Sequence, residues 1–155
     1  MFNISKIFVT FFYIGFSKIA PGSVGSVIFF IILIFLHQSL NTIYLLSIFI
    51  ICFLISLYLI NFYINKVDKE DPQEIIIDEF LGVFIIFFFI DNISKINFYF
   101  LVVLAYILYR LFDILKPFPS GWIDKNIKNS FGIIFDDLIA GIYTILSLVF
   151  FNGLL

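Results

Sequence analysis

The chain has 155 residues, of which 63% are hydrophobic, 13% are charged and 24 are phenylalanine. Soluble domains are about half apolar and a quarter charged, so this composition excludes an ordinary soluble domain and indicates a single integral-membrane domain over residues 1–155. The net charge of -2 gives no reason to expect a nucleic-acid partner, and the single cysteine, Cys52, excludes an internal disulfide.

The first third of the chain alternates apolar runs with short polar segments. Residues 2–16 are apolar but too short to cross a bilayer, so they predict a helix that lies in the membrane interface. The glycine-containing segment 17–26 follows. Residues 24–36 then form a short apolar run that either spans the membrane at a tilt or re-enters it. Residues 43–64 form an uncharged run of 22 residues, which is the clearest transmembrane helix in the sequence.

Three further apolar runs, residues 75–90, 96–115 and 133–151, also predict membrane helices. A charged loop at 65–74 and a polar loop at 116–132 interrupt this part of the chain. The expected fold is therefore all-α: a polytopic membrane helix bundle with about four to five membrane helices and an N-terminal interfacial helix. The sequence leaves the oligomeric state open.

The charged residues are concentrated on one side of this predicted bundle. With the N-terminus in the cytoplasm and five crossings, eight of the nine basic residues share one face and only Lys95 falls opposite. The positive-inside rule assigns the basic face to the cytoplasm. Ten of the eleven acids follow the same distribution, and only Asp91 lies on the other side. Any polar site is therefore expected at the cytoplasmic face.

Five of these acids are predicted about one turn inside the membrane, on three separate helices. A carboxylate in hydrocarbon costs roughly 2.5–3.5 kcal/mol. At a helix N-terminus the helix dipole offsets about 0.3–1 kcal/mol of this, so helix capping is an alternative for the two N-terminal pairs but not for the acid at a helix C-terminus. A shared cation explains five acids at one depth better. These candidate metal ligands and catalytic residues are Asp78, Glu79, Asp113, Asp136 and Asp137.

The candidate ligands are all hard oxygen donors, which favours Mg²⁺, with Mn²⁺ as an alternative, over zinc. The only histidine, His37, falls in a turn on the opposite side. Segment 17–26 adds a predicted phosphate cradle, because flexible glycines, hydroxyls and backbone N–H groups ahead of a helix form an anion site. Ordinary turn chemistry is the alternative there. The candidate phosphate-binding residues of this segment are Lys18, Gly22, Ser23 and Ser26.

Residues 109–125 carry further cations beside a candidate ligand. Arg110 and Asp113 are three positions apart and share a helix face. Pro117 cannot continue the helix, so it holds Lys116 near the helix C-terminus. Two cations and a carboxylate at the end of a membrane helix suit a phosphate group and its metal ion. A positively charged membrane anchor at a helix C-terminus is the alternative interpretation.

These blocks together resemble the phosphatidylglycerophosphatase A family of bacterial membrane enzymes. The match runs in order through SKIAPGSVGS, DPQEIIIDEFLG, YRLFDILKPFPSGWIDK and GIIFDDLIAG, over most of residues 15–141. Where the family often has a Gly-Gly pair before its final Asp-Asp helix, this chain has KNSFG at 128–132. The functional residues that the resemblance implies are Asp78, Glu79, Arg110, Asp113, Lys116, Asp136 and Asp137.

The resemblance implies a magnesium-dependent enzyme in the bacterial inner (cytoplasmic) membrane, with its active site facing the cytoplasm. Its substrate would be the lipid phosphatidylglycerophosphate, dephosphorylated within the bilayer to phosphatidylglycerol. The residues agree with this implied activity by exclusion. The chain has no Cys-x5-Arg loop of a cysteine phosphatase and no Asp-x-Asp motif of a phosphatase with an aspartate nucleophile. Which carboxylate activates water, and whether an aspartate is transiently phosphorylated, both stay open.

A small transporter or proton relay, in which intramembrane carboxylates bind a moving ion, is the main alternative from another functional class. That alternative predicts acids near the bilayer midplane or on both faces, whereas the acids here gather at one face. A purely structural membrane subunit is a third option, and it leaves the clustering of acids unexplained.

Overall fold

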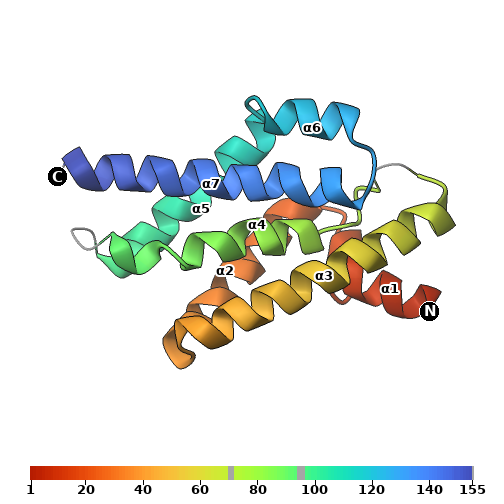
Figure 1. The fold of residues 1–155 in the computed structure, drawn as a ribbon, viewed down its shortest axis with the longest axis horizontal. Helices are drawn as coiled ribbons and strands as arrows, with labels where there is room; N and C mark the ends of the chain where they lie inside the picture. The colour runs from red at the N-terminus through yellow and green to blue at the C-terminus, as the bar shows by residue number, and fades with distance from the viewer. Residues whose placement is uncertain (70–71, 94–96, 155) are drawn as a thin grey trace.

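The computed structural model describes residues 1–69, 72–93 and 97–154 (Figure 1). Within these ranges the chain forms seven α-helices and two short 3₁₀ turns and contains no strand, which confirms the predicted all-α class. The helices are α1 (Phe2–Val9), α2 (Pro21–Ser39), α3 (Thr42–Val67), α4 (Ile77–Phe87), α5 (Phe98–Leu115), α6 (Ser120–Asn126) and α7 (Ser130–Leu154), and the 3₁₀ turns are η1 (Ile14–Phe16) and η2 (Ile90–Asn92).

Four helices in the described part of the chain, α2, α3, α5 and α7, are long and apolar enough to cross a membrane. This number agrees with the predicted four to five membrane helices. The apolar run at residues 24–36, for which a tilted span and a re-entrant segment were alternatives, belongs to α2, a continuous helix of 19 residues. The predicted interfacial helix corresponds to α1, which packs against α3.

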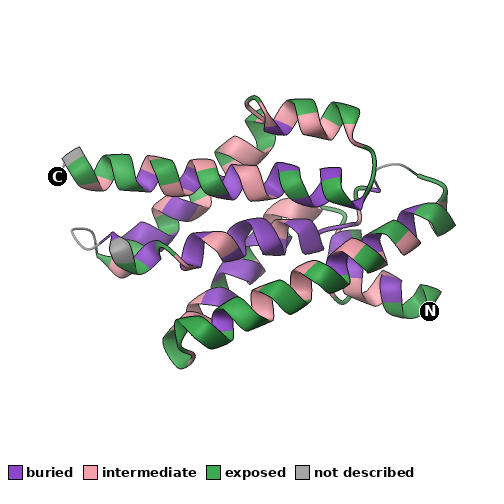
Figure 2. Cartoon of the chain, viewed as in Figure 1, coloured by how far each residue is buried: buried purple, intermediate pink, exposed green. Residues whose placement is uncertain are grey.

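The predicted membrane helix at residues 75–90 is shorter than expected. Its counterpart α4 has 11 residues, about 16 Å at 1.5 Å per residue, which is roughly half of the hydrocarbon thickness. It runs through the middle of the molecule and packs against α7, α2 and α3 (Figure 1). Nine of its residues are buried, and Figure 2 shows this burial along the helix. The segment is therefore apolar because protein surrounds it, as expected for a helix that is hydrophobic on every side.

Two glycines let α4 and α7 approach closely. A Cβ placed on Gly82 would lie 2.6 Å from the backbone oxygen of Asp137, and a Cβ on Gly141 would collide with the backbone oxygen of Gly82. Small residues at a helix crossing allow backbones to touch in this way. Since Gly82 is one turn from Asp78, the contact brings the first turns of α4 close to the acids of α7.

His37 and Asp91, which the sequence places together on the side of the bundle opposite the other acids, lie in contact. His37 in the last turn of α2 bonds through Nε2 to Asp91 Oδ1 at 3.0 Å, and its ring stacks on Phe98 at the start of α5. The predicted position of His37 in a turn was wrong, because the residue belongs to the last turn of α2 and its side chain is only 13% exposed in this packing. Lys95, the one basic residue predicted at this end, lies outside the described residues.

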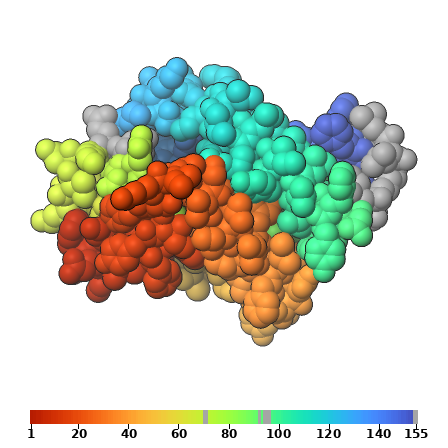
Figure 3. Space-filling model, turned by 180° about the vertical axis from the view of Figure 1, so that it is seen from behind, coloured from red at the N-terminus to blue at the C-terminus, as the bar shows by residue number. Residues whose placement is uncertain are grey.

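The N-terminal segment and α2 lie together on one face of the molecule. Viewed from behind, α2 lies between the N-terminal residues and α5 (Figure 3). Contacts of α2 with α4 and α5 place its first turn next to the beginning of α4 and the later part of α5. The predicted carboxylates of the site lie at the beginning of α4, in the later part of α5 and on α7.

Candidate active site

One cavity of about 130 Å³ brings the five predicted carboxylates together. They come from the first turn of α4, the last turn of α5 and the second turn of α7, so three segments far apart in the sequence contribute to one site. The cavity is lined by Asp78, Glu79, Asp113, Lys116, Asp124, Ile133, Asp136 and Asp137.

The positions of the acids follow from where their helices begin. Because α4 starts at Ile77, Asp78 and Glu79 stand in its first turn, where the helix dipole favours negative charge. Asp78 Oδ1 also accepts a hydrogen bond of 3.0 Å from the Glu79 backbone N–H. On α7, the residues Asp136 and Asp137 are buried, with exposed fractions of 6% and 5%. Buried carboxylates require positive partners or hydrogen-bond donors.

Arg110 connects three helices at the edge of the cavity. Its Nη1 lies 2.6 Å from Asp113 Oδ2 and 3.4 Å from Glu79 Oε2. Its Nη2 donates to the hydroxyl of Ser23, at 3.3 Å, in the first turn of α2. The predicted pairing of Arg110 with Asp113 on one helix face is confirmed. The same guanidinium therefore joins α5 to α4 and to the glycine-containing segment.

Lys116 is the second cation of the site and lies in the cavity itself. Its Nζ bonds to Asp136 Oδ2 at 2.6 Å and to Asp124 Oδ1 at 2.8 Å. Burial lowers the pKa of Lys116, but the hydrogen bonds and ion pairs with the two aspartates outweigh this effect and raise the pKa above its ordinary value. The ammonium therefore stays charged throughout the neutral range. The backbone of Lys116 is left-handed, with φ of 43°, and ends α5 just before Pro117.

Segment 17–26 contributes only partly as predicted. Helix α2 starts at Pro21, a favoured residue for a first helical position, so the segment is largely a helical turn and not a loop before a helix. Gly22 faces the site: a Cβ there would collide with Glu79 Oε1 and lie 3.3 Å from Arg110 Nη1.

Ser23 and Gly22 are thus the members of the predicted phosphate cradle that reach the site. Ser26 is fully buried, and its hydroxyl donates to the backbone oxygen of Gly22 at 2.7 Å, inside its own helix. Lys18 is exposed and does not line the cavity. The structure therefore does not bring Ser26 and Lys18 to the carboxylates.

Two polar residues at the site were missing from the predicted set. Asp124 lines the cavity from α6 and bonds to Lys116. Tyr109 is fully buried, and its hydroxyl donates to the backbone oxygen of Glu79 at 3.3 Å. Both lie in the 109–125 stretch, so the signal for each was their presence in the segment that already contained Arg110 and Lys116.

The chemistry of the cavity fits a hard divalent cation. Its donors are carboxylate oxygens, the ligands that Mg²⁺ and Mn²⁺ prefer. Glu79 Oε2 is buried and accepts no hydrogen bond among the described residues, and its ion-pair partner Arg110 Nη1 lies 3.4 Å away, so a metal ion would give this oxygen a closer cation. No group of three or more histidine, cysteine or acidic side chains in the described part already has a metal-binding arrangement. Lys116 and Arg110 pair with the same carboxylates, and metal binding requires these side chains to rearrange.

The fold and the cavity define a helical membrane protein with a compact polar site, rich in carboxylates and cations, between four of its helices. The family to which it belongs follows from comparison with known proteins. The model of the phosphatidylglycerophosphatase A family matches residues 7–152, so the chain belongs to that family. The resemblance found in the sequence blocks is confirmed.

Individual relatives cover most of the chain. It is 36% identical over 127 residues to phosphatidylglycerophosphatase A of Haemophilus influenzae, covering 82% of this chain and 76% of that protein. It is 30% identical to phosphatidylglycerophosphatase A of Escherichia coli, covering 83% and 72%. A Bacteroides thetaiotaomicron protein named "Putative phosphatidylinositol-3-phosphatase" is 32% identical, with coverage of 84% and 82%. No solved structure matches the chain.

Proposed function

We propose that this protein is a magnesium-dependent phosphatidylglycerophosphatase, which hydrolyses phosphatidylglycerophosphate to phosphatidylglycerol and inorganic phosphate in glycerophospholipid synthesis. The observation that carries the proposal is the convergence of five carboxylates and Lys116 on one small cavity, with Arg110 at its edge. Membership of the phosphatidylglycerophosphatase A family supports the same substrate. Together they favour hydrolysis of a phosphomonoester at the end of a lipid headgroup.

The cations of the site suit a phosphate group. Arg110 offers a planar set of donors that matches phosphate geometry, while Lys116 offers a compact point charge. Both already bind carboxylate oxygens, at 2.6 Å to Asp113 and to Asp136. Phosphate oxygens can take the place of these carboxylate oxygens and keep the same donors. The freed acids are then available for the metal ion and for proton transfer.

The carboxylates supply the remaining chemistry. Asp78, Glu79, Asp136 and Asp137, with Asp113, would hold Mg²⁺, which when bound polarises the phosphoryl oxygens and offsets their charge. In the reaction, water adds to phosphorus while the bond from phosphorus to the glycerol oxygen breaks. A cavity carboxylate accepts the proton of the attacking water, and a proton is delivered to the departing glycerol oxygen. The products are phosphate and the free hydroxyl of phosphatidylglycerol.

The surroundings of the cavity suit a membrane interface on the cytoplasmic side. Phe118 is 78% exposed and Trp122 is 54% exposed, on the segment that connects Lys116 with Asp124. Exposed aromatic side chains of this kind are enriched where membrane and water meet. We place this end of the bundle at the cytoplasmic surface of the bacterial inner membrane, because the predicted charge asymmetry favours that orientation. That asymmetry counts residues 75–90 as one crossing, and the chain passes along α4 from the acids of its first turn to Asp91, which lies beside His37 at the end of α2.

Phosphate release by the purified full-length protein tests this function. Phosphatidylglycerophosphate in detergent micelles is expected to give phosphate and phosphatidylglycerol when Mg²⁺ is present, and neither product after chelation. Phosphatidylinositol 3-phosphate is the comparison substrate, because one relative carries that name. Preferential hydrolysis of this comparison lipid would instead identify phosphatidylinositol 3-phosphate as the substrate. Absence of phosphate release from both lipids, combined with ion flux through reconstituted vesicles, would favour the transporter alternative.

A further inference from the structure

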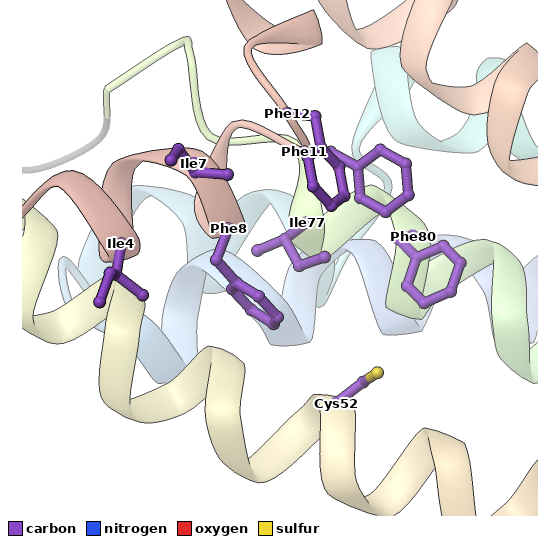
Figure 4. Close-up of a pocket in the computed structure, with 8 residues that line it drawn as sticks. All are labelled: Ile4, Ile7, Phe8, Phe11, Phe12, Cys52, Ile77 and Phe80. Carbon is purple, nitrogen blue, oxygen red and sulfur yellow. The ribbon is translucent and has the colours of Figure 1, made fainter.

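A second, apolar cavity lies on the other side of α4 from the acidic site. It has a volume of about 390 Å³ and lies between α1 with its following turn, α3 and α4 (Figure 4). All eight residues that line it are hydrophobic. Ile77 and Phe80 of α4 form its buried floor, with exposed fractions of 2% and 5%, and Cys52 of α3 lies opposite Phe8 of α1. We refer to this cavity as the apolar groove.

The groove and the acidic cavity share one helical turn of α4. Ile77 and Phe80 line the groove, whereas Asp78 and Glu79, which lie between them in the sequence, line the acidic cavity. Residues three apart share a helix face, and the two residues between them point elsewhere. The first turn of α4 therefore separates an apolar compartment from a polar one, at the same depth in the bundle.

The rim of the groove has an unusual backbone. Three consecutive residues, Phe11, Phe12 and Tyr13, are left-handed, with φ of 42°, 55° and 68°. Non-glycine residues rarely adopt this conformation, and such residues concentrate at functional sites and ligand clamps. Thr10 holds the turn, because its hydroxyl donates to the Lys6 backbone oxygen at 2.7 Å and accepts from the Tyr13 N–H at 3.1 Å. The turn places Phe12, which is 73% exposed, at the opening of the groove.

We propose that the apolar groove holds one acyl chain of the lipid substrate while the acidic cavity holds its terminal phosphate. The inference rests on the proposed function. The acidic cavity, at about 130 Å³, has room for a phosphate group but not for an acyl chain. The groove has the volume of an ordinary ligand pocket and offers no polar side chain, so its chemistry matches a hydrocarbon chain.

The position of the groove favours an acyl chain over a soluble ligand. Cys52 lies in the middle of α3, one of the four helices long and apolar enough to cross a membrane. Helix α1 and the turn that carries Phe12 form one wall of the groove, where Phe12 is 73% exposed. A chain entering there would lie against Ile77 and Phe80, directly behind the turn that presents the carboxylates.

Filling the groove tests the proposal by kinetics. Cys52→Trp places a large ring in the groove, and Ile51→Trp is the matched control, because Ile51 is the neighbouring α3 residue, is 57% exposed and does not line the groove. With dioleoyl phosphatidylglycerophosphate, Cys52→Trp is expected to raise KM about tenfold, the effect of losing contact with roughly two methylene groups. With the deacylated headgroup as substrate, both variants are expected to match the unmodified protein. Equal KM values for both variants on the dioleoyl lipid would overturn the proposal that the groove holds an acyl chain.

Photolabelling of the unmodified protein provides a test that does not depend on turnover. Phosphatidylglycerophosphate with a diazirine near the middle of one acyl chain is expected to label peptides containing Phe8 and Cys52, and unlabelled lipid is expected to compete. Labelling spread evenly over the outer faces of α3, α5 and α7 would indicate bulk lipid only and overturn the proposal.

A disulfide-linked dimer through Cys52 under mild oxidation, with no lipid label in the groove, would identify the groove as a contact between two copies and also overturn the proposal. If the protein releases no phosphate from any lipid, the proposed function fails, and the competition by unlabelled lipid still decides whether the groove binds an acyl chain.

Discussion

Adding one methyl group to Gly22 tests whether the acidic cavity needs the close approach of α2. In Gly22→Ala the new Cβ would overlap Glu79 Oε1 and lie 3.3 Å from Arg110 Nη1. The Glu79 carboxylate would have to withdraw by about 1 Å to restore ordinary packing. A misplacement of about 1 Å costs on the order of 10²-fold in rate. We therefore expect phosphate release to fall by about two orders of magnitude.

The same substitution should not destabilise the helix. Alanine is favoured over glycine in a helix by about 1 kcal/mol, which offsets part of the local strain. Gly153→Ala is the matched control, because nothing lies within 4 Å of a Cβ at that position. Phosphate release and thermal unfolding are measured for both variants in the same detergent. Full activity of Gly22→Ala, or a loss of activity that accompanies unfolding, would show that the cavity does not depend on the close approach of α2.

Three further predictions concern the second cation, the helix crossing and the topology. Lys116→Arg keeps the charge but not the compact ammonium contacts, so phosphate release is expected to fall at least about tenfold; unchanged activity would favour a membrane-anchor role. Gly82→Ala overpacks the contact of α4 with α7 and should lower the free energy of unfolding by about 1–3 kcal/mol, whereas an unchanged unfolding midpoint would contradict the close crossing. In a Cys52→Ser background, an impermeant thiol reagent outside the cell should label Gln38→Cys and not Asn126→Cys; the reverse pattern would invert the protein in the membrane.

The helical class followed from composition, but the length of α4 did not. A run of apolar residues looks the same to a hydropathy analysis whether lipid or protein surrounds it. Helix α4 is surrounded by protein, so 11 residues suffice where a lipid-facing helix would need about 20. The close crossing at Gly82 and Gly141 was equally hidden, because isolated glycines inside apolar helices have several explanations.

The site was more predictable than the fold around it. Charged groups in hydrocarbon are costly, so Asp78, Asp113 and Asp137 at one depth already indicated that they meet. Asp124 did not follow from this argument, because it lies beyond a proline break whose path only the structure gives. Ser26 was wrongly predicted to bind phosphate, because its hydroxyl donates to the backbone oxygen of Gly22 within its own helix. The signal that predicted the carboxylates was their shared depth in the membrane. This signal does not apply to polar residues such as Asp124 that lie outside the membrane helices.

Phosphate release is proposed to depend on the acidic cavity and not on the acidic content of the chain in general. The most direct measurement compares Asp137→Asn with Asp91→Asn over a Mg²⁺ titration, with phosphatidylglycerophosphate as substrate. Both variants remove one negative charge, but Asp137 lines the cavity, whereas Asp91 pairs with His37 outside it. We expect Asp137→Asn to abolish phosphate release at every Mg²⁺ concentration and Asp91→Asn to follow the unmodified protein. Equal activity of the two variants, or phosphate release that is independent of Mg²⁺, would contradict this expectation.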